Sequence, residues 1–136
     1  MANFVPLSLT GIAMSFFVMP AVAHHSFAMF DRDKTVEMQG TVKELELINP
    51  HGWLQLMVAD PKGQVSVWPL EIGGAGQLAR QGWTEAVKPG AKVTVSIHPL
   101  RDGSHGGQLV SLRLPDGREL RQGPFGGGFV PPPGNL

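Results

Sequence analysis

Stretches in which apolar and polar residues alternate predict a series of β-strands along most of the chain. Turns rich in glycine and proline separate these stretches. In the first and longest stretch the apolar parity changes sides after Val42, so we expect a bulge or bend near Gly40. The stretches are residues 34–47, 53–59, 64–72, 88–100 (after a turn at Pro89 and Gly90), 108–114 and 118–121.

One helical segment interrupts the predicted strands. Residues Gly76–Gln81 form the short helix candidate, which Gly82 ends. A single helix between the third and fourth strands of a small, bent sheet is the layout of an OB-like barrel of five to six strands. The alternative is a small β-sandwich, but the immunoglobulin type has about seven strands. Pro69 places the third strand at an edge or at a bulge. We expect an all-β protein with one short helix.

The two ends of the chain differ in composition from the middle. Residues 1–23 carry no charged side chain, and the small residues Ala21 and Ala23 follow Pro20 in the pattern that signal peptidase accepts. We expect a signal peptide cleaved after Ala23, although the usual Lys or Arg is missing. Either the free amino group supplies the positive charge or the start lies further upstream. A retained membrane anchor is the alternative to a cleaved signal. The OB-like domain is then residues 24–121, and the Gly- and Pro-rich residues 122–136 form a flexible tail that cannot join a ladder. The expected location is periplasmic or secreted.

Charge and cysteine content exclude several classes of function. The 11 basic residues equal the 11 acidic residues, which gives no argument for a nucleic-acid partner. We expect no such partner, and no stable membrane anchor after processing. The chain has no cysteine, which excludes disulfides, thiolate zinc sites and cysteine nucleophiles. The sequence contains no phosphate loop, no HExxH helix and no nucleophile with an evident base, so we expect no catalytic residues.

Histidine is therefore the best transition-metal ligand in this chain. Cleavage after Ala23 would give His24 a free α-amino group. That amine, together with the ring of His24 or of His25, offers the tetragonal nitrogen field that Cu(II) favours. We therefore expect the protein to bind a transition metal, with copper as the favoured ion. The alternative is that this polar N-terminus binds no metal.

Two histidines further along the chain could complete such a site. His51 lies in the turn 49–52 and has the parity of Trp53, away from the core. It becomes a third ligand if the N-terminus folds back over this turn; otherwise its ring hydrogen-bonds neighbouring backbone. His98 ends a strand and is an additional candidate ligand. His105 lies in a glycine-rich loop and is expected to be solvated.

An aromatic binding face is the alternative function. OB-like barrels bind sugars or single-stranded nucleic acids on aromatic faces. Trp68 has the parity opposite to Val65 and Val67, so we expect it to be an exposed platform, with Trp53 as a second aromatic. Such a face would recognise a small molecule, a glycan or an envelope partner without a metal. Phe30, together with Phe27, is expected to pack the N-terminal segment against the barrel.

The motifs resemble those of a family of small exported bacterial proteins that is classed as a domain of unknown function. The resemblance rests on His-His-Ser at 24–26, Asp-x-x-Lys at 31–34, Gly-Thr-Val at 40–42 and Asn-Pro-His at 49–51. It continues in Gly-Trp at 82–83, Lys-Pro-Gly at 88–90 and Asp-Gly-Arg at 116–118. The resemblance implies an exported, compact β domain. It brings no activity, because the family is uncharacterised.

Overall fold

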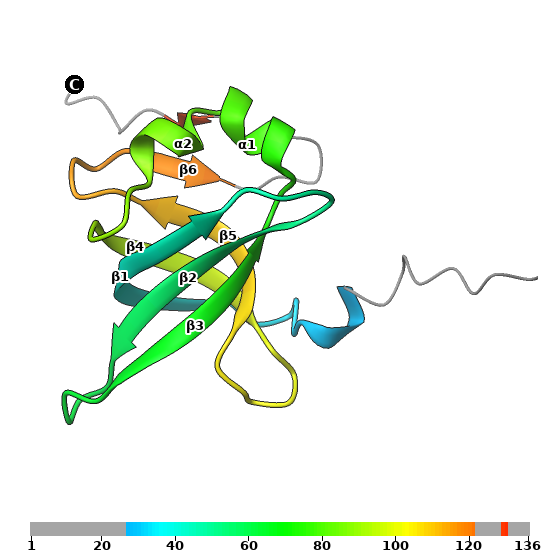
Figure 1. Cartoon of the computed structure of the whole chain (residues 1–136). Coiled ribbons are helices and arrows are strands. Elements are labelled where there is room, and N and C mark those ends of the chain that lie inside the picture. The colour runs from blue at the N-terminus through cyan, green and yellow to red at the C-terminus, as the bar shows by residue number, and fades with distance from the viewer. Residues whose placement is uncertain (1–26, 122–128, 131–136) are drawn as a thin grey trace, which may run out of the picture.

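A computed structural model describes residues 27–121 and 129–130 of the chain, and its strands coil into a small barrel (Figure 1). His24 and His25, the expected signal peptide and most of the expected tail therefore lie outside the described residues. The five barrel strands are β1 (Val36–Glu46), β2 (Gly52–Ala59), β3 (Val65–Ile72), β4 (Lys92–Pro99) and β5 (Gly107–Arg113).

The order of pairing closes the barrel. Strand β1 pairs with both β2 and β4, β2 pairs with β3, and β4 pairs with β5, all antiparallel. A short parallel pairing of Leu70 with Gly107 and of Glu71 with Gln108 joins β3 to β5. This five-stranded closed arrangement with helices between β3 and β4 confirms the expected OB-like barrel. Pro69 pairs with Gln55 of β2 and lies just before the β3–β5 pairing begins.

Two short strands extend the sheet beyond the barrel. Strand β6 (Glu119–Arg121) pairs with β5, and β7 (Phe129–Val130) pairs with β6. The expectation that no residue after Gln122 joins a ladder is therefore wrong at Phe129 and Val130. Phe129 pairs with Leu120, and Val130 pairs with Glu119. Aromatic and β-branched residues such as these are common in strands.

The core fills the barrel with alternate residues from every strand. Strands β2 and β4 show the cleanest alternation, with Leu54, Leu56, Val93, Val95 and Ile97 all buried. The barrel interior is therefore filled by aliphatic side chains.

Strand β1 changes its buried face within its length, as its sequence predicts. The irregularity lies between Val42 and Glu44, slightly beyond the expected position at Gly40. Position 40 requires glycine for a different reason. A Cβ there would lie 2.6 Å from Cγ of Leu56 and 2.7 Å from the Met57 carbonyl oxygen. The strand can cross closely over β2 only because position 40 has no side chain.

Two short helices cover one end of the barrel (Figure 1). Helix α1 (Ala75–Arg80) is the predicted helix, shifted by one residue, and buries Leu78. Helix α2 (Trp83–Ala86) was not predicted, and it buries Trp83 completely. Gly82 separates the two helices at φ 76°, a left-handed conformation that favours glycine. Among the described residues, no helix has the length and apolar character needed to cross a membrane.

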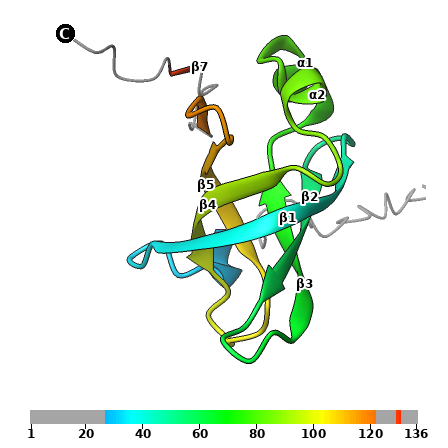
Figure 2. The same ribbon diagram turned by 90° about the vertical axis from the view of Figure 1, so that its left-hand side faces the viewer.

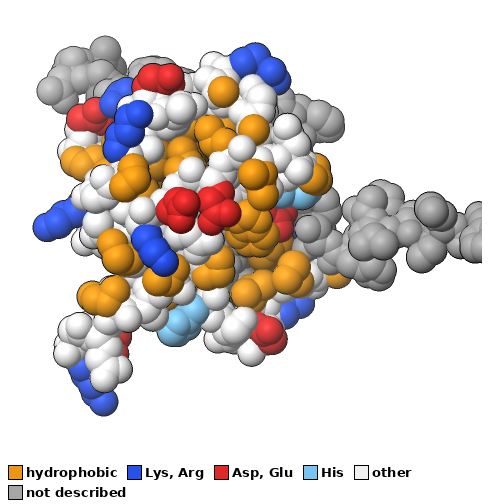
Figure 3. Space-filling view, viewed as in Figure 1, with side chains coloured by type: hydrophobic (Ala, Val, Ile, Leu, Met, Phe, Trp, Pro, Cys, Tyr) orange, Lys and Arg blue, Asp and Glu red, His pale blue; other side chains and the backbone are white. Residues whose placement is uncertain are grey.

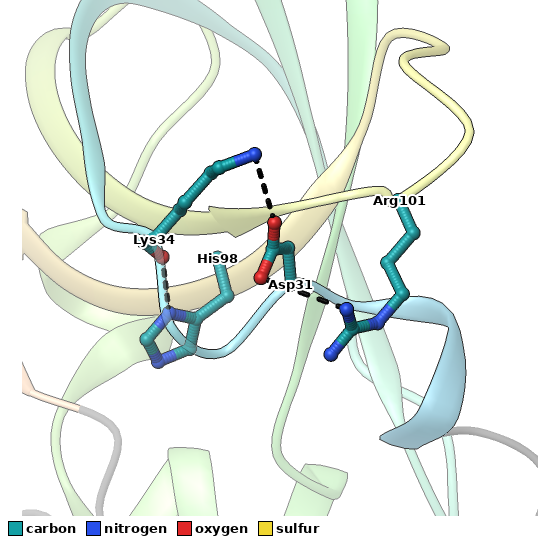
Figure 4. Close-up of polar contacts among 4 residues, drawn as sticks. All are labelled: Asp31, Lys34, His98 and Arg101. Carbon is teal, nitrogen blue, oxygen red and sulfur yellow. Dashed lines mark hydrogen bonds and ion pairs between the residues drawn. The ribbon is translucent and has the colours of Figure 1, made fainter.

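The N-terminal segment is tied to the end of β4 and to the loop after it. The 3₁₀ turn η2 (Phe27–Met29) leads to Phe30, which is buried and forms a bridge with Leu100. Phe30 thus packs the segment against the barrel as expected. The Asp31 carboxylate lies 3.1 Å from the Lys34 ammonium and 3.7 Å from the Arg101 guanidinium (Figure 4). The hydrogen bond with Lys34 is the main reason that the pKa of Asp31 lies below its ordinary value of 3.8.

Candidate functional site

The turn that carries His51 is held by backbone contacts with the chain that follows β3. The Ala75 amide donates a hydrogen bond to the Ile48 carbonyl, and the Gly52 amide donates one to the Gly73 carbonyl. Gly74 lies so close that a Cβ there would be 2.8 Å from Oδ1 of Asn49 and 2.9 Å from the Pro50 carbonyl oxygen. The turn is therefore a packed element between two strands.

His51 stands beside a carboxylate that the sequence analysis missed. Its Nδ1 lies 3.5 Å from Oε1 of Glu71. The Glu71 side chain is 4% exposed, whereas that of His51 is 39% exposed. A buried acid thus lies beside a half-exposed imidazole ring. The available signal in the sequence was a single carboxylate between Leu70 and Ile72, at the end of an otherwise apolar strand.

The ladder registers place Glu71 in a row of cross-strand neighbours that includes Trp53. Trp53 lies opposite Glu46 on one side and Glu71 on the other. Trp53 is half-buried and has an acidic residue as its cross-strand neighbour on each side. It lies on the side of β2 opposite Leu54, as its parity predicts. Glu46 also accepts a hydrogen bond from Nε2 of Gln55 at 3.0 Å. This end of the outer sheet face combines one aromatic ring with acceptor groups.

Trp68 does not lie where the sequence placed it. Val65 and Val67 are 63% and 40% exposed, whereas Trp68 is half-buried and packs against the core cluster. The interpretation of Trp68 as an exposed platform is therefore wrong. The pattern misled because Val65 and Val67 are apolar residues on the solvent side of a strand edge. The Trp68 ring stacks on that of His105 at a centroid distance of 4.6 Å and an angle of 14°.

His98 belongs to the attachment of the N-terminal segment. Its Nδ1 lies 2.8 Å from the Lys34 carbonyl oxygen (Figure 4). Because a carbonyl oxygen can only accept, the ring donates its Nδ1–H in this contact. Gln108 of β5 pairs with Glu71 of β3 on one side and with His98 of β4 on the other. One residue of β5 therefore separates His98 from Glu71 in the row around the barrel.

The expected metal ligands are only partly within the described residues. His51 and His98 are described, whereas His24 and His25 lie outside. Within residues 27–121 and 129–130, no group of three or more His, Asp and Glu side chains is close enough to hold a metal ion. Within the described residues the candidate site is thus the pair His51 and Glu71, and Trp53 is the cross-strand neighbour of Glu71.

An apolar strip crosses the outer face of β2 and β3 beyond Gln55. Met57 lies opposite Val67, and Ala59 lies opposite Val65. Figure 3 shows hydrophobic side chains gathered on the face formed by β1, β2 and β3, with acidic side chains near its centre.

Comparison with solved structures gives one match to an unlike sequence. A crystal structure of the mitochondrial single-stranded DNA-binding protein Rim1 of S. cerevisiae aligns with a TM-score of 0.46 and 19% identity. The alignment covers 66% of this chain and 97% of that chain. No curated protein matches this chain.

The family comparison covers the N-terminal segment and the barrel. The matched residues are 13–109, which include the His-His-Ser and Asn-Pro-His motifs, His98, His105 and Glu71. The match ends within β5 and leaves out β6, β7 and the C-terminal segment. The chain belongs to the Family of unknown function named DUF6152, and it is a small OB-like β-barrel protein.

Proposed function

We propose that this protein is an exported metal-binding protein, with copper as the favoured ion and with no catalytic reaction of its own. The site consists of the α-amino group and ring of His24, the ring of His25 and the ring of His51. Export, signal cleavage after Ala23 and a periplasmic location are parts of the same proposal. The site depends on them because only cleavage produces the amine.

The observation that carries the proposal is the pair formed by His51 and Glu71. Histidines that bind metals in proteins almost always donate their other ring N–H to a carboxylate or carbonyl group. The Glu71 carboxylate lies 3.5 Å from Nδ1 of His51 and is buried. Glu71 belongs to the barrel strand β3. This arrangement favours Nε2 of His51 as the ligand atom. A nitrogen-rich site without thiolates suits Cu(II).

The test begins with the intact mass of the exported protein. A mature chain that begins at His24 supports the proposal, and a first residue at Ser26 or later overturns it. Isothermal titration with Cu(II) then compares the mature chain with its His51→Ala, Glu71→Gln and His105→Ala variants. We expect His51→Ala and Glu71→Gln each to weaken Cu(II) binding about 10- to 100-fold. The first removes a ligand, and the second removes the carboxylate that orients it. His105→Ala is the matched control and should leave the dissociation constant unchanged.

A second candidate function is a metal-independent binding module for a small molecule or glycan. Trp53 supports it, because its half-buried ring lies between Glu46 and Glu71 with Gln55 nearby. Aromatic rings with flanking acceptors are a common arrangement for polar ligands that have an apolar face. A glycan array probed with the mature chain and with Trp53→Ala separates the candidates. Binding that is lost in Trp53→Ala and persists with chelator present favours this module over the metal site.

A further inference from the structure

A groove further along the outer sheet surface shares no residue with the His51 site, although it includes Met57, Ala59 and Val65 of the apolar strip. It has a volume of about 610 Å³, within the range of small-molecule sites in proteins. Strands β1 and β4 form its floor where they pair, with Gln39 opposite Thr94 and Thr41 opposite Lys92. Figure 2 faces this side and shows β1 and β4 between β5–β6 on one hand and β2–β3 on the other.

The charged residues that line the groove are both cations. Lys92 and Arg113 are exposed, and no carboxylate is among the lining residues. The Arg113 guanidinium lies 3.5 Å from the Glu37 carboxylate, just outside the groove. Within the described part of the chain, Lys92 takes part in no ion pair. The rim therefore has a net charge close to +1, which complements a ligand with one negative charge better than a dianion.

The walls of the groove are apolar. Met57, Ala59 and Val65 line the side of the β2–β3 hairpin. Val65 is 63% exposed, so a ligand that covered it would remove apolar surface from water. Leu114 and Pro115 line the side of the β5–β6 turn. A cationic rim beside apolar walls fits a molecule with an anionic head and an apolar body.

We propose that this groove binds an amphipathic monocarboxylate of the fatty-acid type. The carboxylate lies between Lys92 and Arg113, where the guanidinium can donate two parallel hydrogen bonds. The apolar chain lies along Thr41 toward Met57 and Val65. The polar floor groups Gln39 and Thr94 lie opposite each other near Arg113, and they offer further hydrogen bonds to the head.

The test uses the mature chain and decanoate below its micelle concentration, with isothermal titration calorimetry as the readout. We expect decanoate to bind, and Lys92→Gln and Arg113→Gln each to weaken it about tenfold or more. Val65→Ser should weaken it several-fold. Arg80→Gln, which removes an exposed cation from helix α1, is the matched control and should bind within twofold of the wild type. Circular dichroism checks that each variant keeps the wild-type fold.

Three probes with altered chemistry complete the experiment. Acetate has the head without the chain, and decyltrimethylammonium has the chain with a positive head; neither should bind. Binding of decyltrimethylammonium as tight as that of decanoate would mean non-specific apolar adhesion and would overturn the proposal. Tighter binding of decyl phosphate than of decanoate would overturn the assignment of a monocarboxylate. If decanoate binds equally well to Arg80→Gln, Lys92→Gln and Arg113→Gln, the groove is not its binding site. Because the His51 site is separate, none of these results bears on the metal proposal.

Discussion

Gly40 is the residue on which the close crossing of β1 over β2 depends. The substitution Gly40→Ala would place a Cβ 2.6 Å from Cγ of Leu56 and 2.7 Å from a backbone oxygen, so the strands must separate. We expect the free energy of unfolding to fall by about 1–3 kcal/mol, the usual cost of overpacking. Urea denaturation of the mature chain measures it.

The control for this prediction is Gly76→Ala in helix α1. A Cβ at position 76 meets nothing closer than 3.5 Å, and alanine favours a helix more than glycine does. Its stability should equal or exceed that of the wild type. Equal stability of Gly40→Ala and the wild type would show that β1 crosses β2 with room to spare.

Asp31 gives the attachment of the N-terminal segment a dependence on pH. Its hydrogen bond with Lys34, helped by Arg101, lowers the pKa of the carboxyl group below 3.8. A carboxyl group whose folded-state pKa is lowered contributes stability above its ordinary pKa, and this contribution is lost as the pH falls through the folded-state value. Asp31→Asn should therefore be less stable than the wild type at pH 7, and the difference should shrink below about pH 4.

Urea midpoints of both proteins between pH 7 and pH 3 measure this difference. Asp102 and Asp116 also have lowered pKa values, because each accepts hydrogen bonds from nearby groups. Both residues are present in the two proteins, so their effect cancels in the comparison. A difference that stays constant down to pH 3 would mean that the charge of Asp31 does not stabilise the attachment.

At the scale of elements, the turn with His51 depends on the connection between β3 and α1. Gly74→Ala would bring a Cβ within 2.8 Å of Oδ1 of Asn49 and 2.9 Å of the Pro50 carbonyl oxygen. The turn must then move away from β3, and His51 moves with it relative to Glu71. We expect Cu(II) affinity to fall about tenfold in the mature chain, because ligand orientation by a carboxylate contributes on that scale. Titration of Gly74→Ala beside Gly76→Ala measures the effect. A shifted turn with unchanged affinity would remove Glu71 as the orienting group.

The elements also show which parts of the fold the sequence could predict. Strands with strict alternation are predicted best, because one buried face fixes their pattern: β2 nearly to the residue, and β4 apart from the turn residues at its start. Helix α2 was not predicted, since four residues around a single buried Trp83 carry no periodicity. The face of β3 was misassigned at Val65 and Val67 because the strand leaves the barrel there and exposes apolar residues. Its inner positions, Leu70 and Ile72, share the parity of Trp68.

The candidate site was predictable only in part for a related reason. His51 was found because a histidine in a turn between two strands has no place in a core pattern. Glu71 was not found, since its proximity to His51 depends on how β3 lies beside β2 and on the path of the turn. No spacing in the sequence encodes that contact. The proposed ligands His24 and His25 are predictions that rest on the cleavage site.

In the whole molecule, closure of the barrel brings elements that are far apart in the sequence next to one another. The N-terminal segment is fixed to β4 through Phe30 and Asp31, the turn at His51 joins β1 to β2, and Glu71 lies on β3. Closure of β3 against β5 places Glu71 and His98 on either side of Gln108. We propose that the barrel holds His51 and Glu71 as one half of a metal site and that the processed N-terminus supplies the other half.

We propose that the N-terminal histidines and His51 bind the same Cu(II) ion. The most direct test of this proposal is a double-mutant cycle of Cu(II) dissociation constants for chains that begin at His24 or at Ser26, each with and without His51→Ala. If the ligands share one ion, His51→Ala weakens binding about tenfold or more in the chain from His24 and less than about threefold in the chain from Ser26. The same factor in both chains, or no effect in the chain from His24, would contradict a shared site.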